Sequence, residues 1–298
     1  KQIGDFKLYL PPLPIQRKIA AILSAYDDLI ENNNRRIALL EKMAEEIYRE
    51  WFVRLRFPGH ESVKIVKGVP EGWEVRKIGD LVSFDKGVSY SGEGLTEHGT
   101  PLINLKCFSV SGGFRRDGVK PYSGKVRPQH IVHQNDIVIA NTDLTQGGDI
   151  IGNPALVPEI AGSNEYYFSH HLNAVRLDPK RAYRYFFYHL FKSSAFKAYS
   201  KGCASGTTVL GFRQGDLEKF AFYYAGDKLV EQFDNLAQPL HNQVEVLNKS
   251  NDNLRLTRDR LLSRLMSGKI DVEKLNIAFP ESMEEAGAST GSPRPWTS

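Results

Sequence analysis

The stretch from Leu10 to Phe52, "LPPLPIQRKIAAILSAYDDLIENNNRRIALLEKMAEEIYREWF", opens with prolines and then continues for about forty residues without proline or glycine. Proline is tolerated in the first turn of a helix but interrupts a helix interior, so this distribution predicts one long helix after the prolines. Such a helix is roughly 60 Å long at about 1.5 Å per residue, more than a compact domain needs for a core element. We therefore expect it to pair with another helix.

Hydrophobic residues recur every seven positions along this stretch, with a second set three residues after the first. This heptad pattern is typical of coiled coils. The predicted pairing residues are Ile19, Ile22, Tyr26, Leu29, Asn33, Leu40 and Ile47. A buried Asn lowers coiled-coil stability and sets the register by requiring a polar partner, which is one interpretation of Asn33. The alternative is a solvated polar interruption in an ordinary amphipathic helix.

A matching helix is predicted near the other end of the chain, in "KLVEQFDNLAQPLHNQVEVLNKSNDNLRLTRDRLLSRLMSG". Its residues at heptad spacing are Phe233, Leu240, Leu247, Leu254 and Leu261. Pro239 removes one backbone donor inside this helix, so we expect a kink or a restart there. Gly268 is the predicted end of this helix. Because the two helices flank a single middle domain, we expect them to pack antiparallel within one chain.

The residues before the two helices correspond to each other. "QIGDFKLYLPP" (Gln2–Pro12) is similar to "QGDLEKFAFYY" (Gln214–Tyr224), which indicates an internal repeat of about 210 residues. On this interpretation the chain begins at the end of one repeat unit and is incomplete. A trimmed or processed chain would begin in the same way.

Composition defines the broad class of the protein. The 298 residues are 41% hydrophobic and 25% charged, as in a globular chain with one large domain and additional helices. The sequence contains no run of eighteen apolar residues and no signal-peptide pattern, so a membrane span is not expected. Two cysteines, Cys107 and Cys203, predict neither a disulfide framework nor a zinc site, and a reducing, cytoplasmic setting fits best.

Basic residues are concentrated in two segments, although the net charge is only +4. Residues 106–127 contain six basic residues and one acid, Asp117, and residues 176–201 contain seven basic residues and Asp178. Such excesses suit a polyanion, because contacts to phosphates release counterions. A solvated surface is the alternative for either segment alone. Together they favour nucleic acid as a partner.

The middle of the chain has the pattern of an α+β domain. Short strands are predicted around residues 74–84 and 137–140, and one helix of about twenty residues is predicted from Lys180 to Gly202. We expect most of the aromatic residues of this helix to lie in the core. Residues 271–298 end in a segment rich in Gly, Ser, Pro and Glu and are expected to be disordered.

Four segments, in this order, resemble the specificity subunit of type I restriction-modification enzymes. They are "LPPLPIQRKIAAIL", "DLIENNNRRIALLEKMAEEIYREWFVRLRFPG", "PEGWEVRKIGDL" and "LLSRLMSGKIDV". The resemblance implies two long antiparallel helices that space DNA-recognition domains, each of which reads one half of a bipartite target. The chain then divides into 1–13, the end of a preceding recognition domain, 14–57, a spacer helix, 58–226, a recognition domain, 227–270, a second spacer helix, and the 271–298 tail.

The family usually carries two recognition domains, whereas this chain has one. The resemblance therefore implies either the C-terminal half of a full subunit or a half-length subunit that acts as a homodimer. It implies double-stranded DNA and modification subunits as partners, restriction subunits through the complex, and S-adenosylmethionine bound by the modification subunit. A coiled-coil scaffold without DNA contact explains the helices but not the basic middle domain.

The sequence predicts no catalytic residues. An adenine methyltransferase needs an Asn/Asp-Pro-Pro-aromatic motif, and neither "NTDL" (Asn141–Leu144) nor "NPAL" (Asn153–Leu156) supplies it. The carboxylates that a nuclease needs for a divalent metal are scattered along the chain. His170 and His171 are adjacent, and on a strand they would point to opposite faces, so no metal site is predicted.

The predicted DNA contacts are long cationic or polar side chains in or near glycine-containing loops. They are Lys86, Ser89, Tyr90, Arg115, Arg116, Lys120, Lys125, Arg127, Thr207 and Thr208.

Outside its predicted pairing positions, the first helix carries charged residues mixed with apolar ones, and the apolar ones are candidates for docking modification subunits. The set comprises Arg35, Ile37, Leu39, Glu41, Lys42, Glu45, Arg49, Trp51 and Phe52. The alternative is that the apolar members cover the local core.

Overall fold

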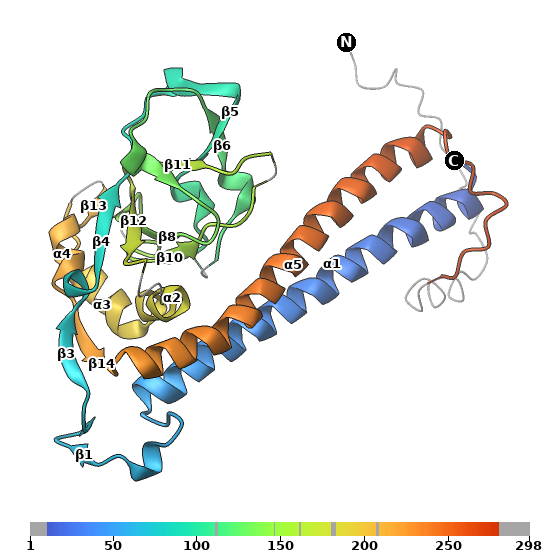
Figure 1. The fold of residues 1–298 in the computed structure, drawn as a ribbon. Helices are drawn as coiled ribbons and strands as arrows, with labels where there is room; N and C mark the ends of the chain where they lie inside the picture. Colours follow the sequence, from blue (N-terminus) through green and yellow to red (C-terminus); the bar gives the residue numbers. More distant parts are fainter. Residues whose placement is uncertain are drawn as a thin grey trace, which may run out of the picture. The chain divides into compact units, whose positions relative to one another are not determined.

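The structure, a computed structural model, describes residues 11–110, 113–145, 147–160, 162–179, 183–206 and 209–279. The chain folds as two compact units. Unit 1 combines residues 1–41 with 243–298, and unit 2 comprises residues 42–242. Two long helices, α1 (Leu13–Tyr48) and α5 (Asp227–Met266), each contribute residues to both units (Figure 1). The boundary expected at residue 226 coincides with the start of α5 at Asp227, whereas α1 ends at Tyr48, before the expected end of the first spacer helix at residue 57. Unit 2 also takes in the adjacent ends of both helices.

Unit 1 is built from α1 and α5 lying side by side in antiparallel orientation (Figure 1). Ile19, near the start of α1, lies in one buried cluster with Leu265, near the end of α5. Further along α1, the Asn33 side-chain amide donates to Asn251 Oδ1 at 2.9 Å. Asn251 in turn donates to Asn34 Oδ1 at 2.9 Å. Asn251 is therefore the polar partner that the heptad interpretation of Asn33 required.

The seam of α1 departs from the predicted heptads at one position. Leu29 is 52% exposed, and the adjacent Ile30 is buried instead, so the assignment of Leu29 to the pairing face was wrong. An undistorted α-helix has 3.6 residues per turn, and its buried stripe drifts by about 20° per heptad relative to a strict seven-residue repeat. Over the length of α1 this drift moves the buried position by one residue.

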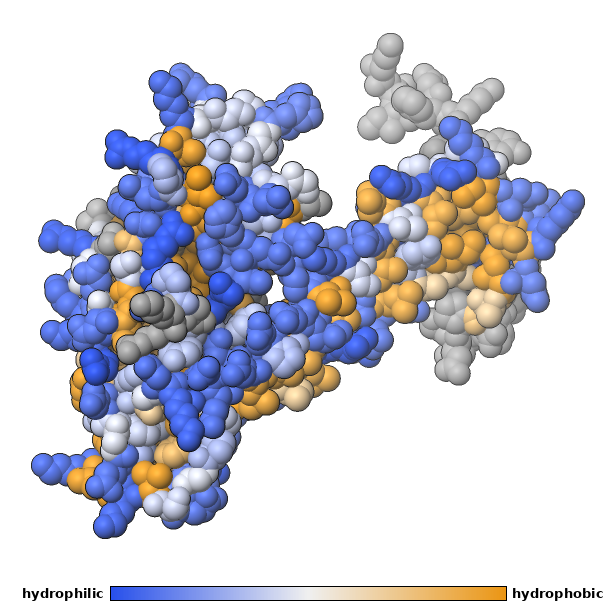
Figure 2. Space-filling model, viewed as in Figure 1, coloured by the Kyte–Doolittle hydropathy of each residue, from blue (hydrophilic) through white to orange (hydrophobic). Residues whose placement is uncertain are grey.

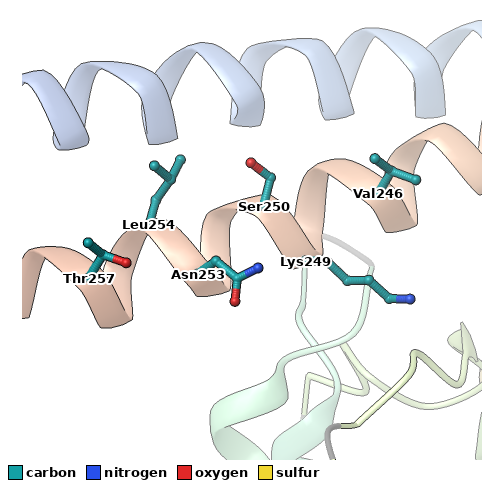
Figure 3. Close-up of a pocket in the computed structure, with 6 residues that line it drawn as sticks. All are labelled: Val246, Lys249, Ser250, Asn253, Leu254 and Thr257. Carbon is teal, nitrogen blue, oxygen red and sulfur yellow. The ribbon is translucent and has the colours of Figure 1, made fainter.

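The other predicted pairing residues lie on the paired faces to different extents. Ile19, Asn33, Phe233 and Leu247 are buried, while the remaining ones are half-buried: Ile22, Tyr26, Leu40, Ile47, Leu240, Leu254 and Leu261. An open groove of about 420 Å³ runs along α5, and among its lining residues Ser250 and Leu254 point toward α1 (Figure 3). Lys249 points away from α1 in the same view.

Helix α5 continues through Pro239 as a single helix, so the predicted restart is absent. Proline removes the backbone donor at its own position, and tertiary packing of the adjacent turns compensates for it. Phe233 and Ala237, in those turns, are fully buried.

Residues 271–279 pack onto α1 instead of being disordered as predicted. Val272 is buried against Ile19 in the unit 1 cluster. The Lys18 ammonium donates to the backbone carbonyls of Glu273 at 2.6 Å and Leu275 at 2.9 Å. The Lys18 ammonium therefore binds several backbone carbonyls of this segment and attaches it to α1. Residues 280–298, the rest of the predicted tail, lie outside the described residues.

Unit 2 contains two four-stranded sheets, with the strand orders β10-β8-β12-β4 and β6-β5-β11-β7. Three two-stranded ladders, β1-β2, β3-β14 and β9-β13, add to them. The strands are β1 (Ile65–Val66), β2 (Val69–Pro70), β3 (Glu74–Lys77), β4 (Val82–Lys86), β5 (Leu95–Ile103), β6 (Lys120–Tyr122), β7 (Ile131–Val132), β8 (Ile137–Ala140), β9 (Thr142–Asp143), β10 (Pro154–Leu156), β11 (Tyr166–Phe168), β12 (Leu172–Leu177), β13 (Leu210–Gly211) and β14 (Ala221–Tyr224). With the short helices α2 (Arg184–Lys192), α3 (Ser194–Cys203) and α4 (Gln214–Glu218) they form the mixed α+β domain that the sequence predicted.

The helix predicted from Lys180 to Gly202 is two helices in the structure, α2 (Arg184–Lys192) and α3 (Ser194–Cys203). Ser193 separates them in an extended conformation, with φ −63° and ψ 148°. Its hydroxyl donates to Leu190 O at the end of α2 and accepts from Phe196 N at the start of α3. A serine that can cap an N-terminus thus competes with continuation of the helix. The short α4 (Gln214–Glu218) follows β13.

The core of unit 2 is aromatic. The predicted core aromatics of α2 and α3 are buried, namely Tyr185, Phe186, Phe187, Tyr188, Phe191 and Phe196, and Tyr199 is partly buried against the same cluster. The end of α1 and the start of α5 belong to this core, because Tyr48 and Phe233 are buried with ring centroids 5.7 Å apart.

Two apolar candidates for docking also belong to this core. Trp51 and Phe52, in the π-helical turn η2 (Arg49–Val53), pack on Phe233 with ring centroids at 6.0 and 5.4 Å. For these two residues the alternative of local core packing therefore holds.

Candidate nucleic-acid interface

One end of the sheet β10-β8-β12-β4 collects several loops. In the register of this sheet Asn173 pairs with Lys86, the last residue of β4, and Leu172 pairs with Ala140, the last residue of β8. The segments that leave β4 and β8 and the turn that precedes β12 therefore lie at the same sheet end. Lys86 and the loop with Ser89 and Tyr90, all predicted contacts, are placed there.

The loop after β4 depends on a glycine. A Cβ atom on Gly87 would lie 2.3 Å from the carbonyl oxygens of both Phe168 and Ser169, so no larger residue fits between these backbones. Gly87 N also donates to Leu172 O at 3.3 Å. The close approach fixes the start of the Lys86–Tyr90 loop against the turn between β11 and β12.

His170 and His171 lie in that turn, with ring centroids 4.0 Å apart, so the prediction that they point to opposite faces was wrong. Alternation holds for a strand, and a tight turn brings adjacent side chains together. The hydroxyl of Thr142 and Nδ1 of His171 form a hydrogen bond of 2.8 Å. Burial lowers the pKa of His171, and the electrostatic influence of the neighbouring His170 and Lys86 lowers it further.

Buried side-chain amides form hydrogen bonds beside this turn. Asn141 donates to His170 O and to Asn173 Oδ1, both at 3.2 Å. Three buried polar atoms of this sheet end, Ser169 Oγ, His170 Nδ1 and Asn173 Nδ2, have no hydrogen-bond partner among the described residues. Buried polar atoms normally find a protein or water partner, so this sheet end is more polar than a packing core requires.

The segment that carries Thr207 and Thr208 is attached to the same end. β13 pairs with β9 in antiparallel register, Leu210 with Asp143 and Gly211 with Thr142. Thr207 and Thr208 themselves lie outside the described residues. Gly206 has φ +137°, and a Cβ there would lie 2.0 Å from Val209 O, so this position requires glycine.

The loop from Asp143 to Asn153 is held by buried polar contacts. The Asp143 carboxylate accepts from Thr145 N and Thr145 Oγ1 at 2.8 Å and from Ile150 N at 2.7 Å. Burial raises the pKa of Asp143, but these donors outweigh it and leave the pKa below its ordinary value. The Lys197 ammonium donates to Asp149 O at 2.7 Å and Ile151 O at 2.8 Å. Burial lowers the pKa of Lys197 to about 8.

A groove of about 890 Å³ lies between this loop and the segment around Arg115. Its walls come from two parts of unit 2. One wall includes Lys106, Val110 and Arg115, and the other includes Leu144 and Thr145. The groove therefore joins a predicted cationic segment to the sheet end described above.

The predicted arginines of that segment make contacts within the protein. Arg115 is exposed and pairs with Asp117, with Nη2 2.6 Å from Oδ2, and the bond to Asp117 raises the pKa of Arg115. Arg116 is half-buried and donates to the backbone carbonyl of Glu159. Both side chains therefore already have partners within the protein, which reduces the positive charge that they can offer to DNA phosphates.

Lys125 and Arg127 are exposed on either side of Val126. Val126 packs in a small cluster with Val88 and Tyr90, so these two cations are neighbours of the loop after β4. Lys120 is half-buried on β6. The structure thus brings Lys86, Ser89, Tyr90, Lys125 and Arg127 into one neighbourhood.

Several cations of the second basic segment are engaged in the fold, while Lys180 and Arg181 lie outside the described residues. Arg176 pairs with Asp85 at 2.7 Å, and Lys192 pairs with Glu45 at 3.3 Å. Lys197 is enclosed by carbonyls, as described above. The count of basic residues from 176 to 201 therefore overestimated the surface available to a polyanion, because a sequence does not show which cations are paired in the fold.

Sequence reasoning missed the loop from Asn141 to Asn153. It considered "NTDL" only as a failed methyltransferase motif, and it did not select Lys106. The clustering of Asn, Asp and Gly in "NTDLTQGGDIIGN" directly after a buried strand is the signal that marks this loop. Among the residues that the structure describes, no three His, Cys, Asp or Glu residues gather into a metal-binding group. No helix within the described ranges has the length and apolar character to cross a bilayer.

Comparison with known proteins defines the family. The model for the type I restriction modification DNA specificity domain matches residues 1–42 and 70–224, so the chain belongs to this family. The similar curated proteins include the type I restriction enzyme MjaIX specificity subunit of Methanocaldococcus jannaschii, 26% identical over 286 residues. The match covers 92% of this chain and 62% of that subunit.

A second relative is the MjaVIII specificity subunit of the same organism, 25% identical over 292 residues, covering 93% of this chain and 65% of that subunit. This chain thus spans less than two thirds of the length of these relatives. Its fold is similar to the crystal structure of the type I restriction-modification system S subunit from M. genitalium, with a TM-score of 0.58 and 17% identity. That match covers 85% of this chain and 61% of the other.

Proposed function

We propose that this chain is the DNA sequence-recognition subunit of a type I restriction-modification complex. Residues 58–226 recognise one half of a bipartite target, and the two long helices dock modification subunits. The observation that carries the proposal is that the family match over residues 70–224 covers the domain whose loops gather around a groove that Lys106 and Arg115 help to line.

The chain itself is non-catalytic in this proposal. Base flipping and methyl transfer belong to the modification subunit, which binds S-adenosylmethionine, and restriction subunits join through the complex. The sequence contains no Asn/Asp-Pro-Pro-aromatic motif to hold a flipped adenine. A cytoplasmic setting, where DNA and partner subunits are available, is part of the same proposal.

Exposed aliphatic side chains on unit 1 support the docking role. They include Leu13, Leu29, Leu39, Val246, Leu256, Leu262, Met266 and Leu275. Figure 2 shows hydrophobic residues gathered over the end of the helix pair where α1 begins and α5 ends. Contiguous exposed apolar residues are typical of protein-binding surfaces.

Two alternatives remain within this frame. A half-length subunit would act as a homodimer and recognise a two-fold symmetric bipartite site. A scaffold would use the helices without direct DNA contact. The mass of the chain in solution distinguishes a monomer from a homodimer, and a homodimer should favour an inverted repeat of the half-site.

Binding to a pool of random duplex DNA at low and high salt tests the recognition role. We expect binding at low salt that weakens steeply as salt rises, because phosphate contacts release counterions. A scaffold would bind no duplex at either salt concentration. Methylation of DNA by the purified chain with S-adenosylmethionine alone would contradict the non-catalytic assignment, whereas methylation that requires added modification subunit supports it.

A further inference from the structure

Three aliphatic side chains of unit 2 are exposed on loops around the candidate interface. Val110 is 65% exposed, Leu144 is 64% exposed and Val209 is 39% exposed. Single exposed aliphatic residues are common on protein surfaces. These three differ because they come from separate loops that the fold brings together.

The groove and the strand register define their arrangement. Val110 and Leu144 line the same groove of about 890 Å³, on its two walls. In the antiparallel ladder of β9 and β13, Leu210 pairs with Asp143, so extending this register by one residue beyond the strand ends places Val209 opposite Leu144. Leu144 is thus the middle member of the set.

The backbone under Leu144 is held in place. Its neighbour Asp143 is 1% exposed and bonds to Thr145 and Ile150 across the turn of the loop. A buried carboxylate with three donors fixes the loop, which preorganises an exposed side chain at low entropic cost. Leu144 therefore protrudes from a rigid support.

Charge around the three residues indicates what they contact. Lys106 and Arg115 line the same groove, as do the buried Asp143 and Asp117, which pairs with Arg115 at 2.6 Å. Lys201 lies nearby, with its ammonium donating to Gly147 O at 3.1 Å and lying 3.9 Å from Asp149 Oδ1. An apolar protein partner would have to desolvate these charged groups, whereas DNA supplies phosphates for the exposed Lys106 and Arg115. Between its phosphates, DNA also presents one apolar group on a base edge, the 5-methyl of thymine in the major groove.

We propose that Val110, Leu144 and Val209 contact thymine 5-methyl groups in the major groove and so contribute to the choice of target sequence. This inference rests on the proposed function, since it assigns a base-reading role to the same DNA-binding site. The cations of the groove bind phosphates in this arrangement, and the aliphatic residues discriminate thymine from the other bases.

The test uses the full chain and duplexes that differ by one methyl group. A recognised motif is first selected from a random duplex pool with the unmodified chain, and each thymine is then replaced by deoxyuridine. We expect a three- to fourfold loss of affinity at each contacted thymine, from about 0.8 kcal/mol per buried methyl-sized group. The variants Leu144→Ala and Val110→Ala should bind the thymine duplex no better than the deoxyuridine duplex at their position.

Val75→Ala is the matched control, because Val75 is 64% exposed on β3, which does not line the groove. It should keep the full thymine preference. Truncation of an exposed side chain changes stability by less than about 0.5 kcal/mol, so all variants should fold.

The outcomes separate this inference from the proposed function. Absence of binding to any duplex at low salt would overturn both. Salt-dependent binding with no loss on deoxyuridine substitution, or a selected motif without thymine, would overturn the inference alone. Equal loss of affinity for thymine and deoxyuridine duplexes in Leu144→Ala would assign Leu144 to a wedge between base steps, which also overturns the thymine contact.

Discussion

The helix pair of unit 1 and the sheet domain of unit 2 differ in how their contacts are specified. In unit 1 the contacts follow one repeat along each helix, and Asn33 meets Asn251 at the position where the repeat turns polar. In unit 2 the candidate interface is made by residues from loops far apart in sequence, such as Lys86, Thr142 and His171, which the sheet register brings together. Periodic contacts can be deduced from spacing, whereas loop contacts depend on strand pairing.

The largest expected effect is a loss of stability from a mutation in the aromatic core of unit 2, which contains the end of α1 and the start of α5. Phe233 is fully buried on α5 and packs against Tyr48, Trp51 and Phe52. Phe233→Ala should lower the free energy of unfolding by about 3–5 kcal/mol, since it removes a ring and leaves a cavity. Urea denaturation measures the change. Leu236→Ala, at a 44% exposed position of the same helix, is the control, and an equal cost for both variants would contradict this core assignment.

Acid should destabilise unit 2 through a buried histidine pair. His189 Nε2 lies 3.0 Å from His241 Nε2, and burial lowers the pKa of His241 to about 4 and that of His189 well below its ordinary value. The unfolded chain binds protons at both rings below pH 6.5, so stability is lost as the pH falls from 6.5 toward 4. The share of His241 is on the order of 3 kcal/mol.

Asp234 opposes this loss. Burial raises its pKa to about 6, although it accepts hydrogen bonds from Tyr185 N and Phe186 N, so the folded state takes up its proton before the unfolded state does. Its contribution increases stability as the pH falls from 6 toward 4. Asp234→Asn removes this contribution and should make the acid loss steeper than in the unmodified chain. Denaturation midpoints at several pH values measure both slopes, and a shallower slope in the variant would contradict the assignment.

The polar pair of unit 1 should have a moderate effect. Asn33→Ala leaves the Asn251 side chain, which is 1% exposed, without one of its two amide partners, so we expect a loss of about 1–3 kcal/mol. Asn32→Ala, on the exposed face of α1, is the control. The double variant Asn33→Leu/Asn251→Leu should recover stability and lose register specificity. Chemical denaturation measures the first effect and disulfide trapping between the helices the second.

At the candidate interface, a single arginine should change the salt dependence of DNA binding. Arg115→Ala should reduce the slope of log affinity against log salt by about one unit, and adding Arg116→Ala should bring the total to at most about two. Arg116 should add less because it already donates to the Glu159 carbonyl. Arg76→Ala is the control, since Arg76 also pairs with a neighbouring carboxylate, Glu74, at 2.9 Å. An unchanged slope in Arg115→Ala would remove Arg115 from the interface.

The smallest effect tests the corrected seam of α1. Leu29→Ala should cost less than about 0.5 kcal/mol, because Leu29 is largely exposed. Ile30→Ala should cost about 2 kcal/mol or more, because Ile30 is buried. If thermal denaturation gave the opposite order, the heptad assignment of Leu29 would be restored.

Much of the fold could be predicted because the relevant signals are local. The long helices, the aromatic core of α2 and α3 and the mixed α+β class follow from spacing and composition. The single helix expected from Lys180 to Gly202 failed at Ser193, whose hydroxyl bonds to both flanking helices, and sequence alone did not reveal that these bonds would form. The expected disorder of residues 271–279 failed because Lys18 holds their carbonyls from the opposite end of the chain.

The arrangement of the candidate site could be predicted only in part. Lys86, Ser89 and Tyr90 were predicted as contacts from a glycine-containing loop, and the structure places this loop beside Lys125 and Arg127; that they contact DNA stays a prediction. Arg176 and Lys192 also looked available, but their partners Asp85 and Glu45 are 91 and 147 positions away in the chain. A sequence shows each charged residue but not its ion-pair partner. Counting basic residues therefore includes cations that are engaged in long-range ion pairs in the fold.

By itself the sequence determined the family, the two helices and their antiparallel pairing, because a heptad repeat and its polar interruption are encoded by neighbours three, four and seven residues apart. Only the tertiary structure decided which residues form the groove. Val110, Leu144 and Val209 come together through the packing of separate loops and the register of β9 with β13. Strand register depends on backbone hydrogen bonds between distant segments, and those bonds exist only in the folded chain.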